Sequence, residues 1–173
     1  VQGSQSAQML TNIEKVLIDE KPALVIVYGD TNSTLAGALA ASKLQIPVVH
    51  IEAGMRSFYK TMPEELNRII TDHCSTLLFS PTKTGILNLK NEGFSIRSTG
   101  TISIDNPKVY HCGDIMLDNS LYFSAIAEQK SDILSQLQLE KKTFILATVH
   151  RNTTTDNPER LTALIESLMN LAI

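Results

Sequence analysis

Acidic residues follow two apolar segments of this sequence, at the point where each segment ends. Asp30 comes after residues 24–28 and Gly29, and Glu52 follows residues 47–51 and precedes Ala53 and Gly54. A carboxylate in such a place can exchange protons with a ligand or pair with a cation, whereas burying it unpaired is costly. Asp30 has a competing interpretation as a helix cap. Glu52 caps no obvious helix, which favours a role in a site.

Further charged residues lie downstream. Pro63 opens a predicted helix whose first turn carries Glu64 and Glu65, an ordinary place for acids because of the helix dipole. Arg68 lies four residues from both Glu64 and Asp72, so it can pair with either. His150 and Arg151 follow the apolar residues 144–149. They are candidates for binding an anion, although a histidine after a strand is more often structural.

The elements that must position these residues alternate between strand and helix. We expect strands at residues 24–28, 48–51, 76–80 and 109–112, with helices at 6–19, 34–44, from 63, 84–91 and 118–129. Connections of this length predict parallel pairing, and ligands of parallel sheets bind beyond the carboxyl ends of the strands. The fold class is therefore α/β, a parallel sheet with helices on both faces. In the helix from Pro63, we expect an inward stripe of Leu66, Ile69, Ile70 and His73.

A polar stretch at residues 129–132 predicts a hinge, so we divide the chain into residues 1–128 and 129–173. The second part should contain a helix at 133–139, a strand at 144–149 and a last helix from 157. The inward residues of that helix are expected to be Leu161, Leu164, Ile165, Leu168 and Met169. One strand cannot bury its own faces, and the chain does not begin with Met, so we expect it to be a truncated piece.

Composition limits the remaining possibilities. The net charge is −3, with no basic stripe, which argues against nucleic acid as a partner. No apolar run approaches the ~20 residues that span a bilayer, and no signal peptide is visible. Cys74 and Cys112 each follow a histidine but lack metal-ligand spacing. We therefore expect no metal site and no cofactor, but buried thiols in a reducing cytoplasm.

Four motifs, taken in order, carry a resemblance to a known family. They are Gly29-Asp30-Thr31, Glu52-Ala53-Gly54-Met55-Arg56, Pro63-Glu64-Glu65-x-Asn67-Arg68 and His150-Arg151. This set resembles the non-hydrolysing UDP-N-acetylglucosamine 2-epimerases over nearly the whole chain. The resemblance implies two Rossmann-like domains of glycosyltransferase-B-like architecture with the site between them, and a homodimer.

The resemblance also implies a reaction, which supplies precursors of surface polysaccharide. A base removes the C2 proton of the UDP-sugar while UDP leaves C1, and UDP adds back after reprotonation on the other face. The matching catalytic carboxylates are Asp30, Glu52 and Glu64. His150 is expected near the diphosphate, and Arg151, Arg68 and Arg56 are further candidates for binding substrate.

Two features refine the resemblance. Residues 56–62 (RSFYKTM) are similar to the branch acting on UDP-2,3-diacetamido-2,3-dideoxyglucuronate, which predicts a cation of this loop near the sugar's acid group. The Gly-Thr-Arg-Pro-Glu, Ser-Gly-Gly and Thr-Glu-Arg-Pro-Glu segments of the family are absent. We therefore expect a central fragment that folds over its first part but does not epimerise alone. A glycosyltransferase of the same architecture and a non-catalytic nucleotide-sugar binding module remain alternatives.

Overall fold

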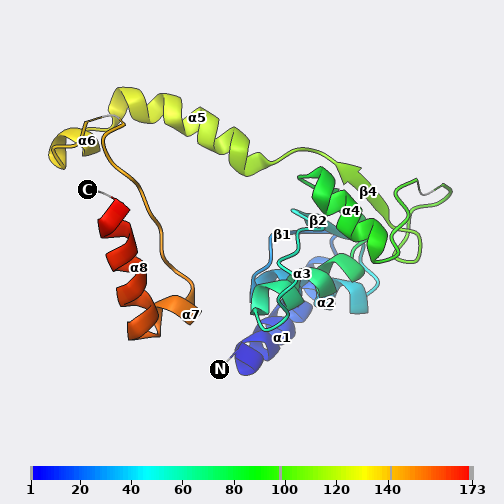
Figure 1. Cartoon of the computed structure of the whole chain (residues 1–173). Coiled ribbons are helices and arrows are strands. Elements are labelled where there is room, and N and C mark those ends of the chain that lie inside the picture. The colour runs from blue at the N-terminus through cyan, green and yellow to red at the C-terminus, as the bar shows by residue number, and fades with distance from the viewer. Residues whose placement is uncertain (1, 98, 141, 172–173) are drawn as a thin grey trace. The chain divides into compact units, whose positions relative to one another are not determined.

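Four short strands form one parallel sheet in the order β1-β2-β3-β4 (Figure 1). The computed structural model describes residues 2–97, 99–140 and 142–171. The strands are β1 (Val25–Tyr28), β2 (Val48–Ile51), β3 (Leu77–Ser80) and β4 (Lys108–His111). The helices that accompany them are α1 (Gln2–Glu20), α2 (Asn32–Lys43), α3 (Pro63–His73) and α4 (Lys83–Asn91). The four predicted strands are confirmed to within one residue at each end.

All four helices pack on the same face of the sheet. Val27, His50, Leu78 and Val109 are aligned across the four strands and all are buried beneath helices. On the opposite face, Ile26 and Tyr28 are 49% and 63% exposed. The α/β class is therefore confirmed, whereas the predicted cover on both faces is not met by the described residues. The strand order explains this, because right-handed crossovers that always step in one direction leave every helix on one side.

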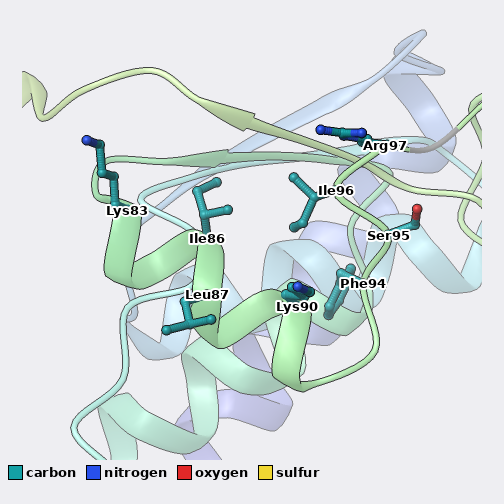
Figure 2. Close-up of a pocket in the computed structure, with 8 residues that line it drawn as sticks. All are labelled: Lys83, Ile86, Leu87, Lys90, Phe94, Ser95, Ile96 and Arg97. Carbon is teal, nitrogen blue, oxygen red and sulfur yellow. The ribbon is translucent and has the colours of Figure 1, made fainter.

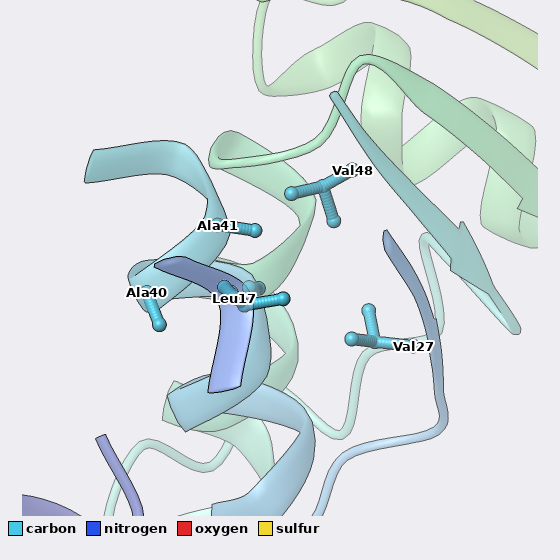
Figure 3. Packing of buried hydrophobic residues seen from close by; sticks show 6 residues of the cluster. Leu17, Val27, Ala40, Ala41 and Val48 are labelled. Carbon is cyan, nitrogen blue, oxygen red and sulfur yellow. The ribbon is translucent and has the colours of Figure 1, made fainter. Parts of the chain in front are cut away.

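Small side chains bring the helices close to β1 and β2. Alanines of α2 are fully or almost fully buried, and a Cβ on Gly37 would lie 3.3 Å from Val27 Cγ1. Figure 3 shows Leu17 of α1 and Ala41 of α2 gathered with Val27 and Val48 of the strands. A second buried cluster of Ala53, Leu78, Leu89 and Val109 lies between α4, β3 and β4.

Helix α3 turns its polar side inward, contrary to the predicted stripe. Leu66, Ile70 and His73 are exposed, whereas the buried residues are Glu65, Asn67, Thr71 and Asp72. The apolar residues do lie along one side of α3, but that side does not face the sheet. The inward polar side chains are stabilised because each of three, Glu65, Asn67 and Asp72, hydrogen-bonds to the loops that follow β1 and β2.

The chain divides into two compact units, residues 1–119 and 120–173. Helix α5 (Ile115–Lys130) crosses this division, and the predicted boundary at 128/129 falls within it. The second unit continues with α6 (Ile133–Gln136), α7 (Asn152–Thr155) and α8 (Pro158–Leu171). The assignment of two domains stays a prediction.

The predicted strand at residues 144–149 is absent from the described part of the second unit, and Ile145 and Leu146 are 64% and 84% exposed. A strand exists only through hydrogen bonds to a neighbour, and this unit has no other described strand to supply them. For the same reason, the predicted inward residues of α8 are not buried. Leu161, Leu164 and Leu168 are half-buried, and Ile165 and Met169 are exposed.

Both cysteines are free. The expected burial is not found: Cys74 is only half-buried, and Cys112 is exposed because it follows the end of the edge strand β4. Among the described helices, none combines the length and the apolar character needed to cross a membrane.

Candidate functional site

The carboxyl ends of β1 and β2 lie side by side and deliver Asp30 and Glu52 to the same edge. Tyr28 is the register partner of Ile51, and the Gly29 N–H donates to the Ile51 carbonyl at 3.1 Å. Parallel strands in this register end at one level. The two predicted carboxylates are therefore neighbours by construction of the sheet.

Arg68 joins these two carboxylates. Its Nη2 lies 2.8 Å from Asp30 Oδ2 and 3.2 Å from Glu52 Oε1. The Arg68 side chain is 13% exposed, against 27% for Asp30 and 45% for Glu52. The cation is therefore mostly buried, whereas both carboxylates reach solvent. The pairings with Glu64 or Asp72 that its spacing allowed are not the ones found, because the Arg68 side chain turns toward the strand ends instead of along its own helix.

Asp30 is not the cap of α2. That position is taken by Thr31, whose hydroxyl accepts the Thr34 N–H at 3.3 Å. The competing interpretation of Asp30 as a helix cap is thereby excluded. Its side chain is available for the ion pair with Arg68.

Glu52 has an unusual backbone conformation. Its φ is +78°, a left-handed value that is uncommon and costly for a side chain of this kind. The N–H groups of Glu52 and Ala53 both donate to the Phe79 carbonyl at 3.0 Å, which ends regular pairing with β3. Strain of this kind persists only where surrounding contacts hold it, and it often marks functional sites.

Gly54 closes the same turn against α4. Its φ is +80°, and a Cβ there would lie 2.5 Å from the Gly85 carbonyl oxygen, so only glycine fits. The Asn88 Nδ2 of α4 donates to the Gly54 carbonyl at 2.9 Å. The Glu52-Ala53-Gly54 motif is therefore a tight turn that aims the Glu52 side chain out of the sheet.

A cavity of about 200 Å³ lies beyond the ends of β2, β3 and β4. Its lining includes Glu52, Phe79, Cys112, Gly113 and Asp114. Sites that enclose a small molecule usually have about 300–1,000 Å³. This cavity can accept one part of such a ligand next to Glu52.

Helix α3 is fixed to the turn after β1 by Asn67. Its Nδ2 donates to the Asp30 carbonyl at 2.9 Å and to Asn32 Oδ1 at 3.0 Å. Glu64 is exposed in the first turn of α3, four residues before Arg68 and so on the same side of the helix. This placement is compatible with a shared site, and the participation of Glu64 stays a prediction.

Arg56 is buried in a network of charged groups. Its Nη2 lies 2.7 Å from both Asp72 Oδ2 and Glu92 Oε2, and the side chain is 1% exposed. Burial lowers the pKa of Arg56, but the hydrogen bonds and charges of Glu92 and Asp72 outweigh burial and raise it. Its role in substrate binding stays a prediction, and these ion pairs connect the loop after β2 to Asp72 of α3 and to Glu92.

Glu65 fixes the loop that follows Arg56. Its carboxylate accepts the Ser57 N–H at 2.7 Å, the Ser57 hydroxyl at 2.9 Å and the Phe58 N–H at 3.0 Å. Burial raises the pKa of Glu65, but the hydrogen bonds from Ser57 and Phe58 outweigh burial, so the pKa lies below its ordinary value. Phe58 has a φ of +58°, which this carboxylate holds in place.

His150 and Arg151 belong to the second unit. Both are exposed and precede α7, and the Arg151 carbonyl accepts the Thr154 and Thr155 N–H groups at 2.8 and 2.9 Å. Their expected approach to a diphosphate stays a prediction.

Three residues of this region were missed as site components by sequence reasoning. Glu65 was treated as an ordinary acid of a first helical turn, Asp72 only as a possible partner of Arg68, and Asn67 only as part of a motif. For Glu65 and Asp72 the available signal was spacing, because they lie three residues before and four residues after Arg68, along one side of the helix. The apolar stripe of Leu66 and Ile70 obscured it.

Another groove, of about 660 Å³, lies over α4 and the segment after it. Figure 2 shows its apolar Ile86, Leu87, Phe94 and Ile96 together with the basic Lys83, Lys90 and Arg97. It contains none of the predicted site residues. No group of three or more potential metal ligands is found within the described ranges.

Comparison with known proteins gives a consistent result. Residues 2–173 match the family model described as UDP-N-acetylglucosamine 2-epimerase. The UDP-2,3-diacetamido-2,3-dideoxy-D-glucuronate 2-epimerase of Pseudomonas aeruginosa is 50% identical over 171 residues, covering 99% of this chain and 45% of that protein. The UDP-N-acetylglucosamine 2-epimerase of Methanocaldococcus jannaschii is 42% identical, covering 98% and 44%. The chain thus spans about 45% of the length of these relatives.

Solved structures agree with the sequence matches. The Methanocaldococcus jannaschii UDP-GlcNAc 2-epimerase in complex with UDP-GlcNAc and UDP superposes with a TM-score of 0.80 at 41% identity, covering 98% of this chain and 44% of that one. The enzyme from Rickettsia bellii gives a TM-score of 0.71 at 31% identity, covering 95% and 42%. The predicted Rossmann-like fold of glycosyltransferase-B-like type is confirmed by these neighbours. The chain belongs to the UDP-N-acetylglucosamine 2-epimerase family.

Proposed function

We propose that this chain forms part of a non-hydrolysing UDP-sugar 2-epimerase, an isomerase that inverts C2 of a UDP-2-acetamido sugar. The observation that carries the proposal is the position of Asp30 and Glu52, which end neighbouring strands and meet at Arg68. Family membership supplies the reaction class. The two carboxylates supply the acid and base groups that such a reaction needs.

The chemistry assigns different work to these groups. Removing the C2 proton requires a base, and returning a proton to the opposite face requires an acid. Asp30, Glu52 and Glu64 are proposed to provide both between them. Loss and return of UDP at C1 require cations near the diphosphate, and His150 and Arg151 are the proposed ones. Arg68 is proposed to hold the carboxylates in place. The contact of one atom, Arg68 Nη2, with both Asp30 and Glu52 supports this role.

Exchange at C2 tests this proposal directly. The complete protein is incubated with the UDP-sugar in deuterium oxide, and the C2 proton signal is followed by proton NMR. Epimerisation with elimination predicts deuterium at C2 of both epimers. A glycosyltransferase would instead transfer the sugar to an acceptor without C2 exchange, and a binding module would leave the sugar unchanged.

For the substrate, we propose the UDP-2,3-diacetamido-2,3-dideoxyglucuronate branch as the second candidate. The 50% identity to the Pseudomonas aeruginosa enzyme of that name favours it. Because Arg56 is buried in ion pairs, the exposed Lys60 is the better candidate for meeting the sugar's acid group. Turnover of both UDP-sugars is compared by proton NMR, and a much faster reaction with UDP-N-acetylglucosamine overturns this branch.

We further propose a homodimer that works in the cytoplasm. Exposed apolar side chains on the loop before α3 and on α3 itself, Phe58, Leu66 and Ile70, provide surface that a second copy could cover. Two free cysteines suit a reducing compartment. Sedimentation equilibrium of the complete protein measures the number of subunits.

A further inference from the structure

We propose that Asp72 and His50 are positioning residues that fix both acidic turns of the site, so that one buried carboxylate sets the geometry of Asp30 and Glu52 together. This inference deepens the proposed function and rests on it for its kinetic consequences. The contacts themselves concern only the first unit of the chain.

Asp72 holds the turn after β2. Its Oδ2 accepts the Gly54 N–H at 3.1 Å, and the same oxygen lies 2.7 Å from Arg56 Nη2. Its Oδ1 lies 2.6 Å from His50 Nδ1. Both oxygens of a fully buried carboxylate are thus used, and one of the bonds reaches the backbone two residues after Glu52.

His50 extends this hold to the turn after β1. Its Nε2 lies 2.8 Å from the Gly29 carbonyl oxygen, directly before Asp30. Neither a carbonyl nor a carboxylate oxygen donates, so the ring must be the donor in both contacts, Nε2–H to Gly29 and Nδ1–H to Asp72. The ring therefore connects Asp72 to Gly29, and the side chain is 0% exposed.

Both turns have left-handed backbone conformations, which a glycine adopts freely but a glutamate does not. Glu52 and Gly54 have φ values of +78° and +80°, and Gly29 has +66°. A glutamate with positive φ persists only where its surroundings determine the conformation. The network contacts the backbone at both turns: Asp72 bonds to Gly54, 18 residues away, and its partner His50 bonds to Gly29, which is 21 residues from His50.

The burial and pairing of Asp72 and His50 also favour a positioning role over contact with substrate. Arg56 bonds both Asp72 and Glu92, so the buried carboxylate is paired with a buried cation. Asp72 and His50 have no exposed surface and cannot touch substrate in this arrangement. Their effect must act through the position of the two site carboxylates, and it should appear in turnover rather than in substrate binding.

The test is Asp72→Asn in the complete protein. An amide oxygen can still accept from the Gly54 N–H and Arg56, but the group that then faces His50 is an NH₂ donor and the negative charge that pairs with Arg56 and His50 is lost. We expect kcat to fall on the order of 100-fold, the effect of a small misplacement of catalytic groups, while KM changes less than about threefold. Rates are referred to the folded fraction measured by circular dichroism. In the 173-residue chain, the amide resonances of Gly29 and Gly54 should both move.

Thr71→Val is the matched control. Thr71 is fully buried, adjoins Asp72 on α3, and its hydroxyl has no hydrogen-bond partner among the described residues. This variant should leave kcat and both glycine resonances unchanged. An Asp72→Asn variant with kcat within about twofold of the parent, or with unmoved Gly29 and Gly54 signals, overturns the inference.

The unmodified chain provides a second measurement if Asp72→Asn does not fold. Nitrogen-15 NMR of His50 should show a proton on Nε2 at neutral pH, and the Gly54 amide should exchange slowly with solvent. An unprotonated Nε2, or a Gly54 amide that exchanges like an exposed one, overturns the inference. If the parent protein shows no C2 exchange, the proposed function fails, and the NMR results alone decide the positioning role.

Discussion

The carboxylates of Asp30 and Glu52 lie 2.8 and 3.2 Å from the same nitrogen of Arg68. Two acids that leave neighbouring strands would repel each other, and the shared cation removes that cost. Arg68 is mostly buried, whereas both acids reach solvent. A ligand at this edge of the sheet would therefore meet the carboxylates and not the arginine.

Glu52→Gln in the complete protein is expected to lower turnover by about 10²–10⁴-fold, the usual effect of losing an acid–base group, with a much smaller change in substrate affinity. Steady-state kinetics and equilibrium binding of the UDP-sugar measure the two effects. Glu20→Gln, the same change on an exposed position of α1, is the control. Near-normal turnover of Glu52→Gln would remove this residue from the chemistry.

Arg68→Met is expected to reduce turnover by about 10–100-fold, because the two carboxylates lose the cation that fixes them. Arg68→Lys keeps the charge and should retain more activity than the methionine variant. The exposed Arg97 provides the matched control Arg97→Met, which should behave like the parent. Equal rates for Arg68→Met and the parent contradict the role assigned to Arg68.

Glu65→Gln should loosen the loop at Ser57 and Phe58 and cost about 1.5–3 kcal/mol, the range for hydrogen bonds to a charged group. The pKa of Glu65 is lower in the folded chain than its ordinary value of 4.5. Its contribution is therefore complete above that value and is lost as pH falls through the folded pKa. Urea unfolding at pH 7 and at low pH measures this, and a difference between parent and variant that persists at low pH refutes it.

Gly54→Ala should destabilise the chain by about 2–5 kcal/mol, since a left-handed φ and a clash with the Gly85 carbonyl act together. Gly93→Ala separates the two effects, because Gly93 has a φ of +97° with nothing near its missing Cβ. It should cost only about 1–3 kcal/mol. Urea unfolding of both variants gives the comparison, and equal losses mean that the clash is relieved at little cost.

Cys112 should react with iodoacetamide well before Cys74. Cys112 is exposed, whereas Cys74 is half-buried and burial raises the pKa of its thiol, which leaves less reactive thiolate. Mass spectrometry of peptides after timed labelling at pH 8 measures both rates. Labelling of Cys74 first would contradict the packing of α3 against the core.

The sequence by itself determined the order of strands and helices in the first unit and the place of the acids at the strand ends. These features follow from local patterns, because an apolar run followed by glycine and an acid reads as the end of a buried strand. The motifs around Asp30, Glu52 and Glu64 also carried the family resemblance. None of this required knowledge of which residues meet.

Only the tertiary structure decided which groups are partners and which faces are covered. Arg68 bonds to Glu52, 16 residues away, and not to the acids four residues away on its own helix. Asp72 pairs with His50 at a separation of 22 residues. The direction of the crossovers leaves one sheet face open, and hydrogen bonds to loops turn the polar side of α3 inward despite its apolar stripe. Such outcomes depend on contacts between distant positions, which local periodicity does not encode.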